Sequence, residues 1–143
     1  MAGNLRRGHA ESHEGPVREA VATEAAPKAI GPYSQGVKAG CFVYTAGQAG
    51  VDPATGKRVE GGIEAQTRQT LKNLRAILEA AGTTLERAVK AGVFLQSMDD
   101  FKAMNAVYAE FFPADKAPPA RTTVQAAKLP LGALVEIDVV ALL

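Results

Sequence analysis

Several residue types are scarce in this chain of 143 residues, and each scarcity excludes a class of site. Cys41 is the single cysteine, which excludes an internal disulfide and every zinc site built from paired cysteines. The two histidines are His9 and His13, so residues 14–143 contain no imidazole. A histidine base or a histidine-ligated metal is therefore excluded unless the N-terminal segment supplies it. Any chemistry must otherwise use arginine, carboxylate, tyrosine, amide, lysine or backbone groups.

An excess of charge of one sign is also lacking. The chain has 16 basic and 15 acidic side chains, for a net charge of +1, which argues against broad electrostatic contact with nucleic acid. No apolar run approaches the ~20 residues that a membrane helix needs, so we expect a cytoplasmic protein. Residues 1–16 mix glycine, charge and histidine without an apolar period. They are expected to form a disordered extension before a single domain at 17–143.

The apolar pattern of the remaining chain predicts six strands and two helices. The strands are expected at Arg18–Thr23, Ser34–Lys38, Cys41–Ala46, Ala88–Ser97, Arg121–Lys128 and Ala133–Leu142. One helix is expected over Ile63–Ala81, with Gly82 as its stop, and a second between Ser97 and Pro113. This order predicts an α+β fold, with a sheet of about six strands and both helices on one face.

Two helices cannot cover both faces of such a sheet. The last strand is apolar on both parities, except that Glu136 and Asp138 lie together on the face without helices. An uncovered apolar face would be an aggregation hazard, so we expect copies of the chain to bury it in a homo-oligomer.

The charged residues of the last strands are the main candidates for a site. Arg121 begins a strand, and Glu136 lies in the middle of the next one. Each has an ordinary interpretation on its own, as a surface arginine and a solvated strand carboxylate. On adjacent strands at an oligomer seam, the two would instead form a charged pocket with apolar walls, suited to a small anionic ligand.

Two other features are interpreted as structural rather than functional. The segment Gly50–Lys57 resembles a phosphate-binding loop, but it has five residues between its glycines and Arg58 in place of serine or threonine, so it is predicted to be a tight turn. Cys41 lies in an apolar segment, so it is expected to be a buried, inert thiol.

Several motifs, in order along the chain, resemble the Rid family, most closely its RidA-type reactive-intermediate deaminases. They are Ile30–Gln35, Thr45–Gln48, Met98–Phe101 with Asn105 and Tyr108, Pro119–Val124, and Leu129–Pro130 followed by Leu134–Ile137. The resemblance covers about residues 18–142. It implies a chorismate-mutase-like subunit, a homotrimer, and active sites in the clefts between neighbouring subunits.

The resemblance also implies an activity, which is hydrolysis of 2-imino acids such as 2-iminobutanoate and 2-iminopropanoate to 2-keto acids and ammonia. Such imines are released by pyridoxal-phosphate-dependent dehydratases. Arg121 matches the arginine that binds the substrate carboxylate, and Glu136 the acid that orients the hydrolytic water. Tyr33, Asn105 and the backbone at Gly47 match pocket groups. No metal and no cofactor is expected.

Two positions depart from the pattern. Thr123, a further expected substrate-binding residue, occupies a place where many relatives have cysteine, and Ala46 one where serine is common. Two other functions stay open: an endoribonuclease or translation inhibitor acting on RNA, and a trimer that binds a small ligand without turnover. The near-zero net charge and the lack of histidine in residues 14–143 weigh against the first of these.

Overall fold

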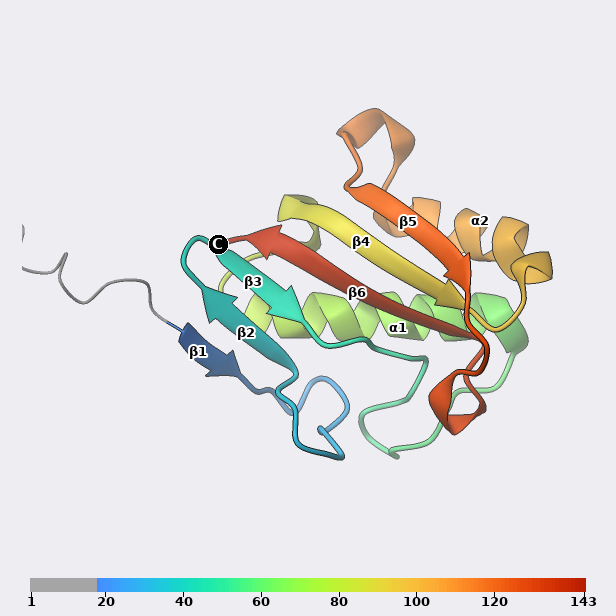
Figure 1. Cartoon of the computed structure of the whole chain (residues 1–143), viewed down its shortest axis with the longest axis horizontal. Coiled ribbons are helices and arrows are strands. Elements are labelled where there is room, and N and C mark those ends of the chain that lie inside the picture. The colour runs from blue at the N-terminus through green and yellow to red at the C-terminus, as the bar shows by residue number, and fades with distance from the viewer. Residues whose placement is uncertain (1–17) are drawn as a thin grey trace, which may run out of the picture.

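A six-stranded sheet with two helices on one face makes up the computed structural model, which describes residues 18–143 (Figure 1). The expected extension 1–16 lies outside the described residues. The strands are β1 (Arg18–Val21), β2 (Gly36–Ala39), β3 (Phe42–Thr45), β4 (Ala88–Leu95), β5 (Ala120–Gln125) and β6 (Val135–Leu142). Their order in the sheet is β1-β2-β3-β6-β4-β5, and every pair is antiparallel except β4 with β5. The predicted fold class is confirmed, with boundaries that shift by a few residues.

Helix α1 (Gly62–Ala80) forms where the apolar stripe predicted it. Leu71, Leu74 and Leu78 recur at helical spacing on one side and are fully buried. Gly82 follows the helix with φ 95°, a left-handed conformation that favours glycine and stops the helix. The apolar stripe and the glycine stop were therefore sufficient to predict this helix.

Helix α2 (Phe101–Phe111) begins after a 3-10 turn at Met98–Asp100. The Ser97 hydroxyl accepts a hydrogen bond from the Asp99 N–H at 3.1 Å, which satisfies one of the free donors at the start of the turn. Both helices lie behind the sheet in Figure 1 and pack on the same face of it.

The core lies between this sheet face and the helices. Along β6, the alternate residues Val135, Ile137 and Val139 point toward the helices and are at most 2% exposed. The residues between them point to the other face, where Glu136 and Asp138 are half-buried. Large apolar side chains are exposed on that open face, among them Tyr44, Val124 and Leu142. The prediction that two helices would leave one apolar face uncovered is confirmed.

Two expectations about local structure are wrong. β5 and β6 are consecutive in sequence but not adjacent in the sheet, because β4 pairs with both and lies between them. Cys41 is exposed, because it lies in the tight turn between β2 and β3, where Gly40 has φ 60°.

The segment Gly50–Lys57 is a turn, as predicted. Val51 and Arg58 bridge its two ends, and the Gly56 N–H donates to the Asp52 carbonyl at 2.8 Å. Within residues 18–143, no helix combines the length and the apolar character that a membrane span requires.

Candidate active site

A pocket of about 360 Å³ lies at the end of the sheet where β6 begins. It is formed by the loop before β2, the segment that follows β3, the turn before β6, and β6 itself. Its lining residues are Pro27, Lys28, Ile30, Tyr33, Gly47, Gln48, Ala49, Val51, Pro53, Gly56, Pro130, Leu131 and Glu136. Glu136 is the one acid among these residues, and Lys28 the one base. The pocket is therefore a mostly apolar hollow with a single carboxylate, of the size that holds small molecules.

Gly47 lies directly beside the Glu136 carboxylate. Two backbone hydrogen bonds between Gln48 and Ile137, of 2.9 and 3.0 Å, hold the segment after β3 against β6. A Cβ atom on residue 47 would lie 2.5 Å from Glu136 Oε2, so only glycine leaves room for the acid in this position. The sequence-predicted residues Tyr33, Gly47 and Glu136 thus line one pocket.

Burial raises the pKa of Glu136 above its usual value of 4.5, and the nearby charge of Asp138 raises it further. The pKa of Asp138 is also raised by burial, while hydrogen bonds to backbone N–H groups, that of Gly92 included, and the charge of Lys90 oppose the shift. A carboxyl group with a raised pKa is a stronger base when ionised, and it exchanges protons more readily near neutral pH. A carboxylate with these properties is chemically able to accept a proton from a water molecule.

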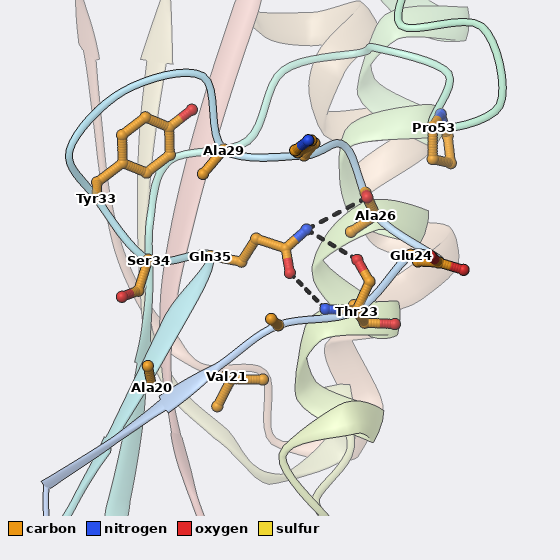
Figure 2. A pocket seen from close by; sticks show the side chains of 12 residues that line it. Ala20, Val21, Thr23, Glu24, Ala26, Ala29, Tyr33, Ser34, Gln35 and Pro53 are labelled. Atoms are coloured by element: carbon orange, nitrogen blue, oxygen red, sulfur yellow. Dashed lines mark hydrogen bonds between the residues drawn. The ribbon is translucent and has the colours of Figure 1, made fainter.

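The loop that carries Tyr33 is tied down by the buried side chain of Gln35 (Figure 2). The Gln35 carboxamide oxygen accepts from the Thr23 N–H at 2.6 Å. Its nitrogen donates to the carbonyls of Thr23, Ala26 and Pro27 at 3.0, 3.2 and 2.7 Å. One side chain therefore closes the loop from residue 23 to residue 35, and the Tyr33 hydroxyl accepts a further bond from the Ile30 N–H at 3.2 Å.

Arg121 belongs to a second cluster, on β5 and α2. Its Nη1 donates to Asn105 Oδ1 at 2.7 Å. Its guanidinium carbon lies 4.7 Å from the centre of the Tyr108 ring and 5.6 Å from that of Phe101, within cation–π range. The amide and the two rings fix the plane of the guanidinium, a geometry suited to bidentate binding of a carboxylate.

Two polar atoms near this cluster lack hydrogen-bond partners. Thr123 Oγ1 and Tyr108 Oη are both buried and unpaired within the described residues. Thr123 lies two residues after Arg121 on β5, and therefore on the same face of the strand. Burial raises the pKa of Tyr108, against the lowering effect of Arg121, so its hydroxyl stays protonated at neutral pH and is available as a donor.

The two groups of site residues lie on opposite faces of the sheet. Arg121 pairs with Ala91, whose other partner Val139 faces the helices, whereas Glu136 pairs with Phe94 on the open face. The expectation that Arg121 and Glu136 lie on adjacent strands is therefore wrong, because β4 lies between β5 and β6. The pocket that the two residues were expected to share was placed at the seam of an oligomer. Within one chain, the acid and the arginine belong to two separate groups of residues.

Sequence reasoning missed three residues that shape these sites. Gln35 ends the Ile30–Gln35 motif and was expected in a strand, but neither signal indicated its buried role, which depends on backbone carbonyls that only the fold brings together. Leu131 adopts φ 61°, which the neighbouring Pro130 and Gly132 hinted at by marking a turn. Phe101 was named only as the last residue of the Met98–Phe101 motif, and its half-buried ring packs against the core and also faces Arg121.

Fold and site together define a small α+β subunit with a mostly apolar pocket around Glu136 and a separate cluster around Arg121. Comparison with known proteins agrees with this class. The model of the family described as endoribonuclease L-PSP matches residues 23–143. A RutC family protein of Pyrococcus horikoshii is 51% identical over 125 residues, which are 87% of this chain and 98% of that protein.

A mouse protein named 2-iminobutanoate/2-iminopropanoate deaminase is 43% identical over 87% of this chain and 91% of its own length. Among solved structures, a Rid family protein of Yersinia pestis is 43% identical with a TM-score of 0.85, over 89% of this chain and all of that one. Escherichia coli TdcF, solved with bound serine, is 40% identical with a TM-score of 0.82, over 87% and 98% of the two chains.

The chain belongs to the endoribonuclease L-PSP family, which includes the Rid proteins. The resemblance drawn from the motifs is confirmed. The relatives' names support a Rid-type deaminase of reactive imine intermediates.

Proposed function

We propose that this protein hydrolyses 2-imino acids, such as 2-iminobutanoate and 2-iminopropanoate, to 2-keto acids and ammonia. The observation that carries the proposal is Glu136, a carboxyl group with a raised pKa in a mostly apolar pocket beside Gly47. The kinship with the mouse imine deaminase supports the same chemistry. Dehydratases that use pyridoxal phosphate and act on serine or threonine are the expected source of such imines.

The reaction consumes one water and needs one base. The Glu136 carboxylate accepts a proton from a water as the water oxygen forms a bond to the imine carbon, and the C=N electron pair moves to nitrogen. Glu136 then passes this proton to the nitrogen, which gives a neutral carbinolamine. As the C–N bond breaks and the carbonyl forms, the hydroxyl proton is carried by Glu136 to the departing nitrogen, so that ammonia leaves and Glu136 is again ionised. A water held about 3 Å from an already electrophilic carbon accounts for much of the acceleration.

The carboxylate of the substrate is assigned to Arg121. A guanidinium has five N–H groups, and only one bond to Asn105 is needed to orient it, which leaves a fork for two parallel bonds to a carboxylate. The unpaired hydroxyls of Tyr108 and Thr123 would then find partners on the ligand or on the neighbouring chain. Lysine at position 121 could not reproduce the planar fork.

Because the arginine and the acid lie on opposite faces of the sheet, we place the complete site between subunits. In this arrangement the Arg121 cluster of one subunit meets the Glu136 pocket of its neighbour, around a homotrimer that also covers the open face. A head-to-tail contact of this kind closes into a ring, so each of three subunits contributes to two sites. Sedimentation should give a trimer at micromolar concentration, and a stable monomer would contradict the arrangement.

An assay with imine generated in place by an amino-acid oxidase or a dehydratase tests the activity. Ammonia or keto-acid release should be accelerated by the wild-type protein and not by Arg121→Ala or Glu136→Gln. Unchanged turnover in Arg121→Ala would refute the carboxylate-binding role, and absence of acceleration by wild type would refute the function.

RNA cleavage is the second candidate, because the matched family model carries the description endoribonuclease. Cleavage that persists through repurification and disappears with a point substitution in the pocket would favour it.

A third candidate is ligand binding without turnover. It would be favoured by a 2-keto acid that binds through Arg121 in the absence of any imine hydrolysis.

A further inference from the structure

Leu131 combines two unfavourable features at the rim of the Glu136 pocket. Its backbone is left-handed, with φ 61° and ψ 20°, a conformation that costs free energy for any residue with a branched side chain. Its side chain is nevertheless 60% exposed, although it is large and apolar. Neither burial nor turn geometry explains leucine here, since glycine would fit the backbone without strain and would expose no apolar surface.

Arg58 holds this strained turn in place. Its Nη1 donates to the Leu131 carbonyl at 2.6 Å, across 73 residues of chain. The same atom lies 2.6 Å from the point where a Cβ on Gly132 would be, so the guanidinium occupies the space that this glycine leaves. Arg58 itself is fixed by the bridge to Val51, in a segment that lines the same pocket. Two distant parts of the wall are therefore joined by one charged hydrogen bond.

The exposed side chain of Leu131 is accessible to a molecule bound in the Glu136 pocket. It lines the pocket together with Glu136, Gly47 and Tyr33. Ile30, from the loop before β2, lines the same pocket and is 75% exposed. Two exposed apolar side chains thus line the same pocket as the carboxylate, and an aliphatic group packed against them would lose contact with water.

We propose that Leu131 is a specificity-determining residue that contacts the alkyl side chain of the 2-imino acid, and that Arg58 is a positioning residue that holds Leu131 there. This inference rests on the proposed imine hydrolysis and adds a determinant of substrate length to it. Glu136 acts on the water and the nitrogen at the reacting C=N bond, which is common to all substrates, whereas Leu131 contacts the part that varies.

Leu131→Gly tests the inference, because glycine accepts φ 61° and removes the wall. The substrates are the imines of alanine, 2-aminobutyrate and leucine, each made in place by an amino-acid oxidase. We expect kcat/KM for the alanine imine to change less than twofold. For the longer imines, kcat/KM should fall by about fourfold for each methylene that loses its contact, mainly through KM. The melting temperature should not fall.

Arg58→Ala should weaken the same discrimination, and Arg58→Lys, which keeps a donor, should restore part of it. Met98→Ala is the matched control, since Met98 is 41% exposed and lies outside the pocket. Equal losses for all three imines in Leu131→Gly, with or without a change of oligomeric state, would overturn the inference alone. A wild-type protein inactive on every imine would overturn it together with the proposed function.

Discussion

Co-expression of an Arg121→Ala chain with a Glu136→Gln chain should restore activity that neither chain has alone. The two residues lie on opposite faces of the sheet, separated by β4, so one subunit cannot bring them together. If each site takes its arginine from one subunit and its acid from the next, a mixed ring contains sites in which both residues are intact.

The expected magnitude follows from counting. A site is intact only when its arginine donor is the Glu136→Gln chain and its acid donor is the Arg121→Ala chain. Random mixing in equal amounts makes each condition true half of the time, so about one quarter of all sites should be intact. In a trimer that contains both chains, about one site in three is intact whichever chain is in excess.

The assay uses a different affinity tag on each chain and purification over both tags in succession, so that only mixed oligomers remain. The rate of imine hydrolysis per subunit is then compared with wild type. Oligomers that carry two tags on the same variant are the matched control and should stay inactive. Mixed oligomers as inactive as this control would show that each site is built within one subunit, and would refute the composite arrangement.

Four further predictions concern Gln35, Gly47 and Glu136. Gln35→Glu removes the N–H donors that bind three backbone carbonyls. We expect the free energy of unfolding in denaturant to fall by about 2–4 kcal/mol, and trypsin to cleave faster after Lys28. A loop as resistant to trypsin as in the wild type would contradict the role given to Gln35. Gly47→Ala should lower kcat at least tenfold and the free energy of unfolding by about 1–3 kcal/mol, because the new Cβ must displace the Glu136 carboxylate. A kcat equal to that of the wild type would show that this carboxylate is free to move. The acid limb of the pH profile of kcat/KM should lie above pH 4.5, because Glu136 works ionised and its pKa is raised. Asp138→Asn should move this limb to lower pH, since the charge of Asp138 contributes to the raised pKa. A limb that does not move would show that Asp138 does not raise the pKa of Glu136. The raised pKa also means that the folded chain binds this proton more tightly, so stability should fall as pH rises from 4.5 through the folded value, which unfolding at several pH values measures.

The elements of the fold could be read from the sequence because their signals are local. The stripe through Leu71, Leu74 and Leu78, the glycine at 82 and the serine at 97 each act within one or two turns of the chain. The uncovered sheet face was also predictable, because both parities of the last strand are apolar.

The order of the strands was not predictable in this way. β5 and β6 follow one another in sequence, yet β4 lies between them, because β5 pairs with β4 in parallel at the edge of the sheet. No local pattern records which neighbour a strand chooses. The error placed Arg121 and Glu136 on adjacent strands, in a pocket expected at the seam of an oligomer. The motif resemblance, which placed the site between subunits, did not depend on that order.

The site residues also divide into those that a local sequence signal marks and those that it does not. Glu136 and Arg121 stood out as charged residues in apolar strands. Gln35 and Leu131 did not, because the role of one depends on carbonyls from three other residues and that of the other on an arginine 73 positions away.

The chain has three tyrosines and no tryptophan, and Tyr33, Tyr44 and Tyr108 lie at three different places. Tyr33 lines the Glu136 pocket, Tyr44 lies on the open face, and Tyr108 lies beside Arg121. Ultraviolet emission from the protein therefore comes from one tyrosine at each of these three places. Replacing two of them with phenylalanine leaves a single-site optical probe, so that loop opening, subunit association and anion binding are each followed without an added label.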